Sequence, residues 1–138
     1  MIDQGVIHIG DLLITGGGSI GIPYIVSFEP IYVKDADLIC IAQNNKLDNR
    51  FLYHYLLTNS FRDYLSDITH NAIIAHYTIS QINNTIVPVP PLATQQSIVS
   101  TLDKFTALIA NIEQEIALRQ KQYEYYREQL LSFERSLC

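Results

Sequence analysis

The C-terminal part of the chain carries a heptad pattern that few folds can accommodate. Alternating steps of four and three residues from Ile98 define a seam in which eleven of twelve positions are apolar or aromatic. Its members are Ile98, Leu102, Phe105, Ile109, Ile112, Ile116, Arg119, Tyr123, Tyr126, Leu130, Phe133 and Leu137. A helix from about residue 94 to the C-terminus would be roughly 65 Å long. Because a domain of this size is narrower than that, we predict that the seam packs against another helix.

The one charged member of the seam, Arg119, bears on how two such helices would pair. In a parallel homodimer the two Arg119 side chains would face each other at a d-type position. In an antiparallel pair that crosses near Ile116, each Arg119 would lie near Glu113 of the other helix. We therefore predict an antiparallel homodimer. The alternative is that Arg119 extends along its own helix into solvent.

A composition boundary at "PVPPLATQQ", residues 88–96, separates two parts of the chain. Before it, short apolar runs alternate with Gly, Asn, Asp and Pro, whereas no Gly or Pro follows it through Cys138. The prolines lack amide donors and bias the residues before them away from helix. The sequence thus predicts an α+β protein, with a small mixed α/β domain over residues 1–90 and one long coiled-coil helix over 91–138.

Within the first part, runs rich in Ile, Val and Tyr and bounded by turn residues predict strands at 6–9, 11–15, 22–27 and 36–42. Residues 47–68 read as helix with Asp48 or Asn49 as its N-cap, and the apolar stripe allows a break near Asn59. A last edge strand is predicted at 83–90, because Pro88 and Pro90 cannot donate to a central ladder.

The segment "GGGSIG", residues 16–21, matches the dinucleotide-binding pattern G-x-G-x-x-G. That site needs a helix that begins inside the glycines, so that its N-terminus faces the pyrophosphate. Here the glycines precede a β-like stretch that contains Pro23. A Walker lysine is also missing, since Ile22 follows Gly21. We interpret the segment as a strand-to-strand turn that uses glycine for positive φ.

The net charge, the cysteine count and the length of the apolar runs exclude several classes of protein. A net charge of −5 over 138 residues argues against broad nonspecific nucleic-acid binding, unless cations are placed locally or supplied by a basic partner. The two cysteines, Cys40 and Cys138, match no zinc spacing and no disulfide framework. No apolar run is long enough for a membrane span, and the first residues lack a secretory signal. We expect a cytoplasmic protein with no membrane partner.

Several segments resemble the specificity subunit of Type I restriction–modification systems. They are "GDLLITGGGSIGIPYIV" (10–26), "AHYTISQINNTIVPVPPL" (75–92), "IVPVPPLATQQSIVSTLDKF" (86–105) and "ALRQKQYEYYREQLLSF" (117–133). The resemblance implies a target recognition domain that ends at a Pro-Pro-Leu junction and a long helix after it. In that family two recognition domains and two antiparallel helices set the distance between half-sites. This chain has one helix and a short, apparently partial domain, so a natural half-subunit, a truncated product and a recombination cassette all remain open.

The resemblance implies a non-catalytic subunit that binds double-stranded DNA and directs methyltransferase and restriction subunits to a bipartite target. The residues point the same way. The four histidines form no metalloprotease motif and pair with no nucleophile motif; they are His8, His54, His70 and His76. No [ND]PP[YF] methyltransferase motif occurs either. We therefore expect no catalytic residue, no cofactor and no metal. By the resemblance, "QKQYEYYREQ" (120–129) helps to hold the modification subunits, the alternative being ordinary coiled-coil packing of its tyrosines.

Candidates for DNA contact are loop residues that could reach phosphates or base edges. Thr15 and Ser19 flank the glycines, whose bare backbone permits a close approach to phosphate. Lys34 is one of four cations before the junction, and Asn71 can make the bidentate adenine contact. The same loop-like stretch contributes His76 and Tyr77. For each residue the alternative is turn chemistry or core packing, and Tyr77 in particular could be buried.

A second function from another class is a coiled-coil assembly module that docks on modification subunits without reading DNA. Eight acidic residues against four Lys and Arg before Pro88 favour this alternative. Sequence-preferring duplex binding that weakens with salt would separate the two functions.

Overall fold

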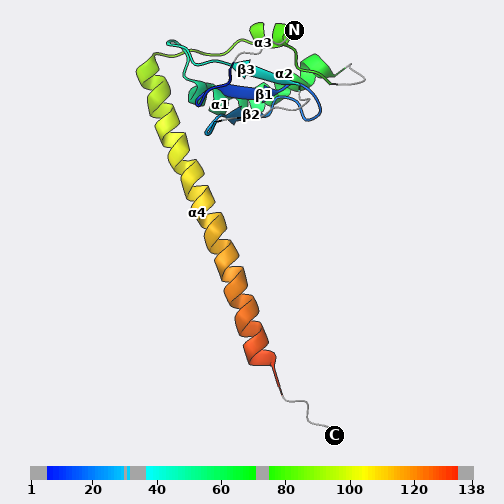
Figure 1. Cartoon of the computed structure of the whole chain (residues 1–138), viewed down its shortest axis with the longest axis vertical. Coiled ribbons are helices and arrows are strands. Elements are labelled where there is room, and N and C mark those ends of the chain that lie inside the picture. The colour runs from blue at the N-terminus through cyan, green and yellow to red at the C-terminus, as the bar shows by residue number, and fades with distance from the viewer. Residues whose placement is uncertain (1–5, 30, 32–36, 71–74, 134–138) are drawn as a thin grey trace. The chain divides into compact units, whose positions relative to one another are not determined.

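The computed structural model of the protein describes residues 6–29, 31, 37–70 and 75–133. The chain divides into two compact units, Met1–Ser100 and Thr101–Cys138. The first unit holds a small sheet and short helices, and the long helix α4 (Leu92–Leu131) begins in it (Figure 1). The α+β class expected from the sequence is confirmed.

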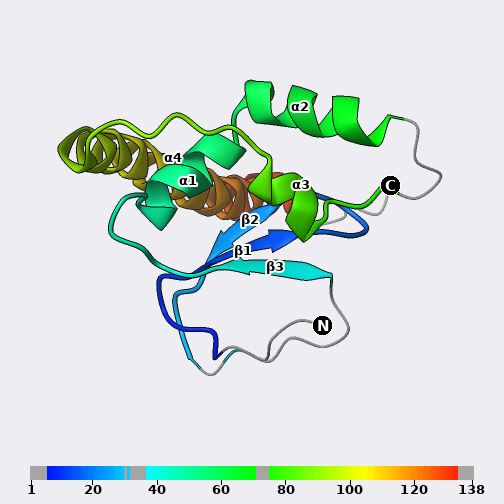
Figure 2. The same ribbon diagram turned by 90° about the horizontal axis from the view of Figure 1, so that it is seen from above.

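The sheet has three antiparallel strands in the order β2-β1-β3 (Figure 2). They are β1 (Leu12–Thr15), β2 (Pro23–Ile25) and β3 (Leu38–Ile41). In the central strand, Leu13 lies between Tyr24 and Cys40 of its neighbours. The strands predicted at 11–15, 22–27 and 36–42 are therefore confirmed, each shorter than predicted.

Two capped helices follow the sheet in sequence, α1 (Asn49–Leu56) and α2 (Asn59–Thr69). The Asp48 carboxylate accepts from the Arg50 amide at 2.7 Å and starts α1. The Thr58 hydroxyl accepts from the Phe61 amide at 3.3 Å and starts α2. Both the N-cap at Asp48 and the break near Asn59 are confirmed, because each signal is local and the cap satisfies an orphan helix amide.

The core forms where these helices cover one face of the sheet, as Figure 2 shows. Side chains alternate across a strand, so Leu12 and Ile14 of β1 point to the same face. The buried core consists of Leu12, Ile14, Leu52, Leu56, Phe61, Leu65 and Tyr77. This small cluster is the main apolar stabilisation of the first unit.

Two strand predictions are wrong. Residues 6–9 form no strand, because the His8 amide donates to the Asp11 carboxylate at 2.9 Å and the Ile9 amide to Glu29 at 2.8 Å. These amides are satisfied by side chains rather than by a ladder. Residues 83–90 form no strand either; the Thr85 amide donates to the Ile82 carbonyl at 3.1 Å.

A short helix, α3 (Ile79–Asn83), is present where the sequence analysis placed no element. Thr78 and Gln81 form a capping box at its start, in which each side chain accepts from the other residue's backbone amide. The pattern Thr-x-x-Gln is the sequence signal that could have revealed this helix.

The start of α4 is joined to the rest of the first unit by Gln95. Its side chain is 0% exposed and makes three hydrogen bonds to backbone. Oε1 accepts from the Asp48 amide at 2.8 Å, while Nε2 donates to the carbonyls of Lys46 at 3.0 Å and Pro90 at 2.8 Å. A single buried amide group thus connects the junction before α4 to the N-cap of α1.

Helix α4 begins two residues before the predicted position, at Leu92, and its last residue is Leu131. The Thr94 amide donates to the Pro91 carbonyl at 2.9 Å, so Pro91 supplies an acceptor to the first turn. The predicted extension to the C-terminus, with Leu137, falls partly outside the described residues. Among the residues that the structure describes, no helix is apolar enough over a sufficient length to cross a membrane.

We predict that Gln95→Leu destabilises the protein by about 3 kcal/mol. Leucine fills a similar volume but leaves one backbone amide and two carbonyls of part-buried hydrogen bonds without their partner, at a cost of about 1 kcal/mol each. Urea unfolding followed by circular dichroism measures the change. Gln96→Leu is the matched control, because Gln96 is exposed one position along the helix. Equal stability of the two variants would contradict the role assigned to Gln95.

Candidate functional site

Three segments that are distant in sequence meet at Gly16. Its amide donates to the Asp37 carbonyl at 2.6 Å, and its carbonyl accepts from the Tyr77 amide at 2.8 Å. A Cβ at Gly16 would lie 2.8 Å from the Tyr77 carbonyl oxygen, which is closer than real Cβ contacts. Glycine is therefore required here by close backbone packing, and the junction places the residues beside 37 and 77 next to the glycine loop.

The glycine loop itself is closed by Thr15. Its hydroxyl donates to the Ser19 carbonyl at 2.5 Å and accepts from the Ile22 amide at 3.0 Å. Gly18 and Gly21 have φ of 67° and 73°, the left-handed region that favours glycine. The loop joins antiparallel strands β1 and β2, so the strand-to-strand turn is confirmed and no helix begins inside the glycines.

An acid and an imidazole lie at the edge of this loop. His76 Nδ1 is 3.4 Å from Asp37 Oδ2, with the two side chains 50% and 67% exposed. A Cβ at Gly17 would lie 2.6 Å from the same Asp37 oxygen. The carboxylate is thus confined between the imidazole and the bare Cα of Gly17, and it faces solvent.

The candidate DNA-contact residues fall into four groups. Ser19 is exposed in the loop and His76 is exposed beside Asp37, both on segments that meet at Gly16. Thr15 is the last residue of β1, and its hydroxyl already has two partners in the glycine loop and at its end. Tyr77 is 2% exposed in the core, which favours the packing alternative for that residue. Lys34 and Asn71 lie outside the described residues.

The burial of Tyr77 has a chemical consequence. Its hydroxyl lies 2.7 Å from Thr85 Oγ1, and burial raises the pKa of the phenol, an effect that this hydrogen bond partly offsets and that nearby Tyr64 reinforces. Tyr77 therefore stays neutral and holds its segment in place through packing and one hydrogen bond. Asp37 was not among the predicted site residues, because it lay inside the predicted strand at 36–42, whereas the observed strand β3 begins after it at Leu38.

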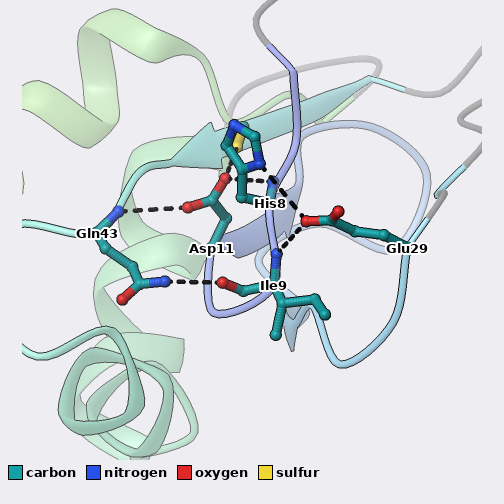
Figure 3. Close-up of polar contacts among 6 residues, drawn as sticks. His8, Ile9, Asp11, Glu29 and Gln43 are labelled. Carbon is teal, nitrogen blue, oxygen red and sulfur yellow. Dashed lines mark hydrogen bonds and ion pairs between the residues drawn. The ribbon is translucent and has the colours of Figure 1, made fainter.

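A second polar cluster holds the segment before β1, as Figure 3 shows. The Asp11 carboxylate is buried and accepts from the amides of His8 at 2.9 Å and Gln43 at 3.3 Å. The Gln43 side chain donates to the Ile9 carbonyl at 2.8 Å. Burial, with the nearby Asp11 charge, raises the pKa of the Cys40 thiol, so this thiol is a poor nucleophile. The cluster is structural in character.

The described residues contain no group of three or more His, Cys, Asp or Glu side chains placed to hold a metal ion. The clusters at Asp37 and Asp11 each combine carboxylate oxygens with backbone or imidazole nitrogen donors. Of the two, only the pair Asp37–His76 is exposed and so available for hydrogen-bond recognition.

In the second unit, α4 presents its seam to solvent. Eight apolar seam side chains are between 49% and 79% exposed: Phe105, Ile109, Ile112, Ile116, Tyr123, Tyr126, Leu130 and Phe133. Arg119 donates to Gln122 at 3.0 Å and pairs with Glu115 at 3.4 Å on the same helix. Ile98 and Leu102, at the start of the seam, are each 37% exposed. An apolar stripe of this length on one helix is typical of a surface that a partner covers.

Comparison with known proteins gives the class of the chain. The sequence model of one family, described as Type I restriction modification DNA specificity domain, matches residues 2–118. This match covers both the sheet unit and more than half of α4. The chain belongs to this family, and the resemblance found in the sequence is confirmed.

Individual relatives agree with this class. A putative type I restriction enzyme specificity subunit of Haemophilus influenzae is 41% identical over 129 residues, which is 90% of this chain and 32% of that protein. The EcoR124I/EcoR124II specificity subunit of Escherichia coli is 35% identical over 70% of this chain and 24% of its own length. The chain therefore spans a third or less of these relatives.

A shorter relative has a similar extent. The C-terminus of a putative type I specificity subunit of Mycoplasma pneumoniae is 29% identical, over 88% of this chain and 81% of that protein. A chain in a solved structure on complex assembly and conformational transition of the type I R-M system has a TM-score of 0.68 at 22% identity. It covers 93% of this chain and 31% of the other, and so supports the fold.

We predict that Gly16→Ala costs about 2 kcal/mol of stability, because a Cβ 2.8 Å from a backbone carbonyl forces the three segments apart. Gly18→Ala is the control. The positive φ of Gly18 is unfavourable for alanine and costs about 1 kcal/mol of stability, but no heavy atom lies within 4 Å of the added Cβ. Urea unfolding of both variants measures the difference. A Gly18→Ala loss larger than that of Gly16→Ala would contradict the junction.

Proposed function

We propose that the chain is a non-catalytic DNA-sequence specificity module of a Type I restriction–modification enzyme. The observation that carries this proposal is the family match over residues 2–118, which takes in the sheet unit and most of the helix together. Residues 1–90 act as a partial target recognition domain, and residues 91–138 act as the helix for dimerisation and subunit docking. Its place of action is the cytoplasm.

DNA contact comes from the loops that meet at Gly16. The exposed Ser19 and His76 reach phosphates or base edges, and Thr15 keeps the loop in shape through its two hydrogen bonds. Lys34 and Asn71 remain candidates on sequence grounds alone. Tyr77 supports the surface from within the core.

The exposed seam of α4 takes a second copy of the same chain. A second copy supplies an equally long apolar seam, so that no part of either stripe stays uncovered. The antiparallel arrangement is favoured because it brings each Arg119 near Glu113 of the other helix. That contact replaces the exposed ion pair of Arg119 with Glu115 on its own helix. The seam around this crossing comprises Ile98, Leu102, Phe105, Ile109, Ile112, Ile116, Arg119, Tyr123, Tyr126, Leu130 and Phe133.

Two recognition units related by a twofold axis read a bipartite, symmetric target in double-stranded DNA. Methyl transfer and cleavage are supplied by methyltransferase and restriction subunits, in keeping with the relatives, which are named specificity subunits of restriction enzymes. The acidic balance of the chain fits this division of labour, because basic partner subunits then provide the contacts to phosphate.

We predict a stable homodimer that Ile116→Glu disrupts. A buried, unpaired carboxylate at the centre of the seam opposes association by several kcal/mol. Sedimentation equilibrium over a range of concentrations gives the dimer dissociation constant, which we expect to rise at least about a hundredfold. Gln114→Glu adds the same charge on the opposite side of the helix and leaves the mass at that of a dimer.

The direction of pairing is read in the same measurement. In the antiparallel dimer Glu113→Arg places like charges together and weakens association, and adding Arg119→Glu restores it. A monomer in the unmodified chain at all concentrations contradicts the homodimer.

We further predict that the chain, assembled with the methyltransferase subunit, binds duplex DNA with a preference for one sequence. Affinity falls as salt rises, because phosphate contacts release counterions. Fluorescence anisotropy with a selected duplex and a scrambled one measures both effects, and the preference should exceed about a hundredfold. The methyltransferase subunit without the chain is the control. A complex that forms but binds both duplexes equally would identify the chain as an assembly module.

A further inference from the structure

The pair Asp37–His76 has a geometry that the proposed DNA-reading function leaves unexplained. Both side chains are at least half exposed, yet the carboxylate position is restricted on two sides. His76 Nδ1 lies 3.4 Å from Oδ2, and the bare Gly17 Cα leaves room for that oxygen where any Cβ would come within 2.6 Å. The backbone below is also fixed, since the Asp37 carbonyl accepts from Gly16 at 2.6 Å.

The pair presents hydrogen-bond acceptors to solvent. A carboxylate beside Nδ1 favours the proton on that nitrogen, so the neutral imidazole has its lone pair on Nε2. Among the described residues no hydrogen bond occupies Asp37 Oδ1. The atoms Nε2 and Oδ1 are therefore both acceptors, on side chains that are 50% and 67% exposed. The carboxylate also carries a negative charge that phosphate would repel.

In the major groove, adenine N6 and cytosine N4 are hydrogen-bond donors, whereas guanine O6 and thymine O4 are acceptors. Acceptors of the protein match the first two and oppose the last two. Adenine also carries the acceptor N7 beside N6, which opposes the second carboxylate oxygen, so cytosine suits a carboxylate better. A carboxylate at a DNA interface is suited to a base edge rather than to the backbone, and the adjacent imidazole limits its repulsion with phosphate. The lack of a side chain at Gly17 lets a base edge approach the carboxylate closely.

We propose that Asp37, positioned by His76 and Gly17, reads the exocyclic amino group of a cytosine in the major groove. This inference rests on the proposed DNA-reading function and names a specificity-determining residue within it. His76 acts as a positioning residue that also offers Nε2 to the same edge.

The test is Asp37→Asn in the full chain, assembled with the methyltransferase subunit and used to select duplexes from a randomised library. Asparagine keeps the shape and the backbone bond to Gly16, but its NH₂ group turns one acceptor into a donor. We expect one position of the selected site to change from cytosine toward adenine, by about tenfold or more, because the asparagine amide can accept from adenine N6 and donate to N7. Asp67→Asn, an exposed acid on α2, makes the same charge change and leaves the selected sequence unaltered.

A second variant tests the position of the carboxylate without removing it. Gly17→Ala displaces the Asp37 side chain and should make the same base position degenerate, at least about tenfold less selective. Selected sequences from both variants that match the unmodified protein overturn the inference, while the DNA-reading function stands. Absence of any preference in the unmodified assembly instead overturns the proposed function, and this inference with it.

Discussion

The two backbone hydrogen bonds of Gly16 are the constraint on which the arrangement of the surrounding loops depends. They join the end of β1 to the residue before β3 and to the chain beside Tyr77, segments that no local signal brings together. Because the junction is backbone to backbone, it fixes position without using a side chain. Everything exposed around it, Ser19, Asp37 and His76, can therefore vary in chemistry while the junction holds the loops in place.

Gln95 has the equivalent role at the junction before α4. It is fully buried, and its three hydrogen bonds go to the backbone amide of α1's N-cap residue, to a carbonyl two residues before that N-cap, and to a carbonyl just before α4. An apolar residue could fill this volume, but it could not make hydrogen bonds to the Asp48 amide and the carbonyls of Lys46 and Pro90, none of which lies in a strand. The proline-rich segment can thus leave the sheet unit as irregular chain and still end in an ordered first turn of α4.

Local signals were readable from the sequence, and distant pairings were not. The N-cap at Asp48, the break before α2 and the long helix follow from spacing within a few residues. The segment 6–9 has strand-like composition, but its amides bind the side chains of Asp11 and Glu29, the latter 20 residues away from Ile9. Asp37 was overlooked for the same reason, because its significance comes from His76 and Gly17, which only the fold brings near. The strand predicted at 83–90 is absent because the Thr85 amide donates to the Ile82 carbonyl at the end of α3.

Under the proposed function, an acidic recognition module separates specificity from affinity. Phosphate contacts supply most of the free energy of DNA binding and carry no sequence information, whereas base contacts supply discrimination. A chain with net charge −5 is poorly suited to the first task and, through acceptors such as Asp37, well suited to the second. Under the proposed function its intrinsic affinity stays low, so that a free module does not occupy DNA. Binding then requires dimerisation through α4 and basic partner subunits, which makes sequence reading conditional on assembly of the whole enzyme.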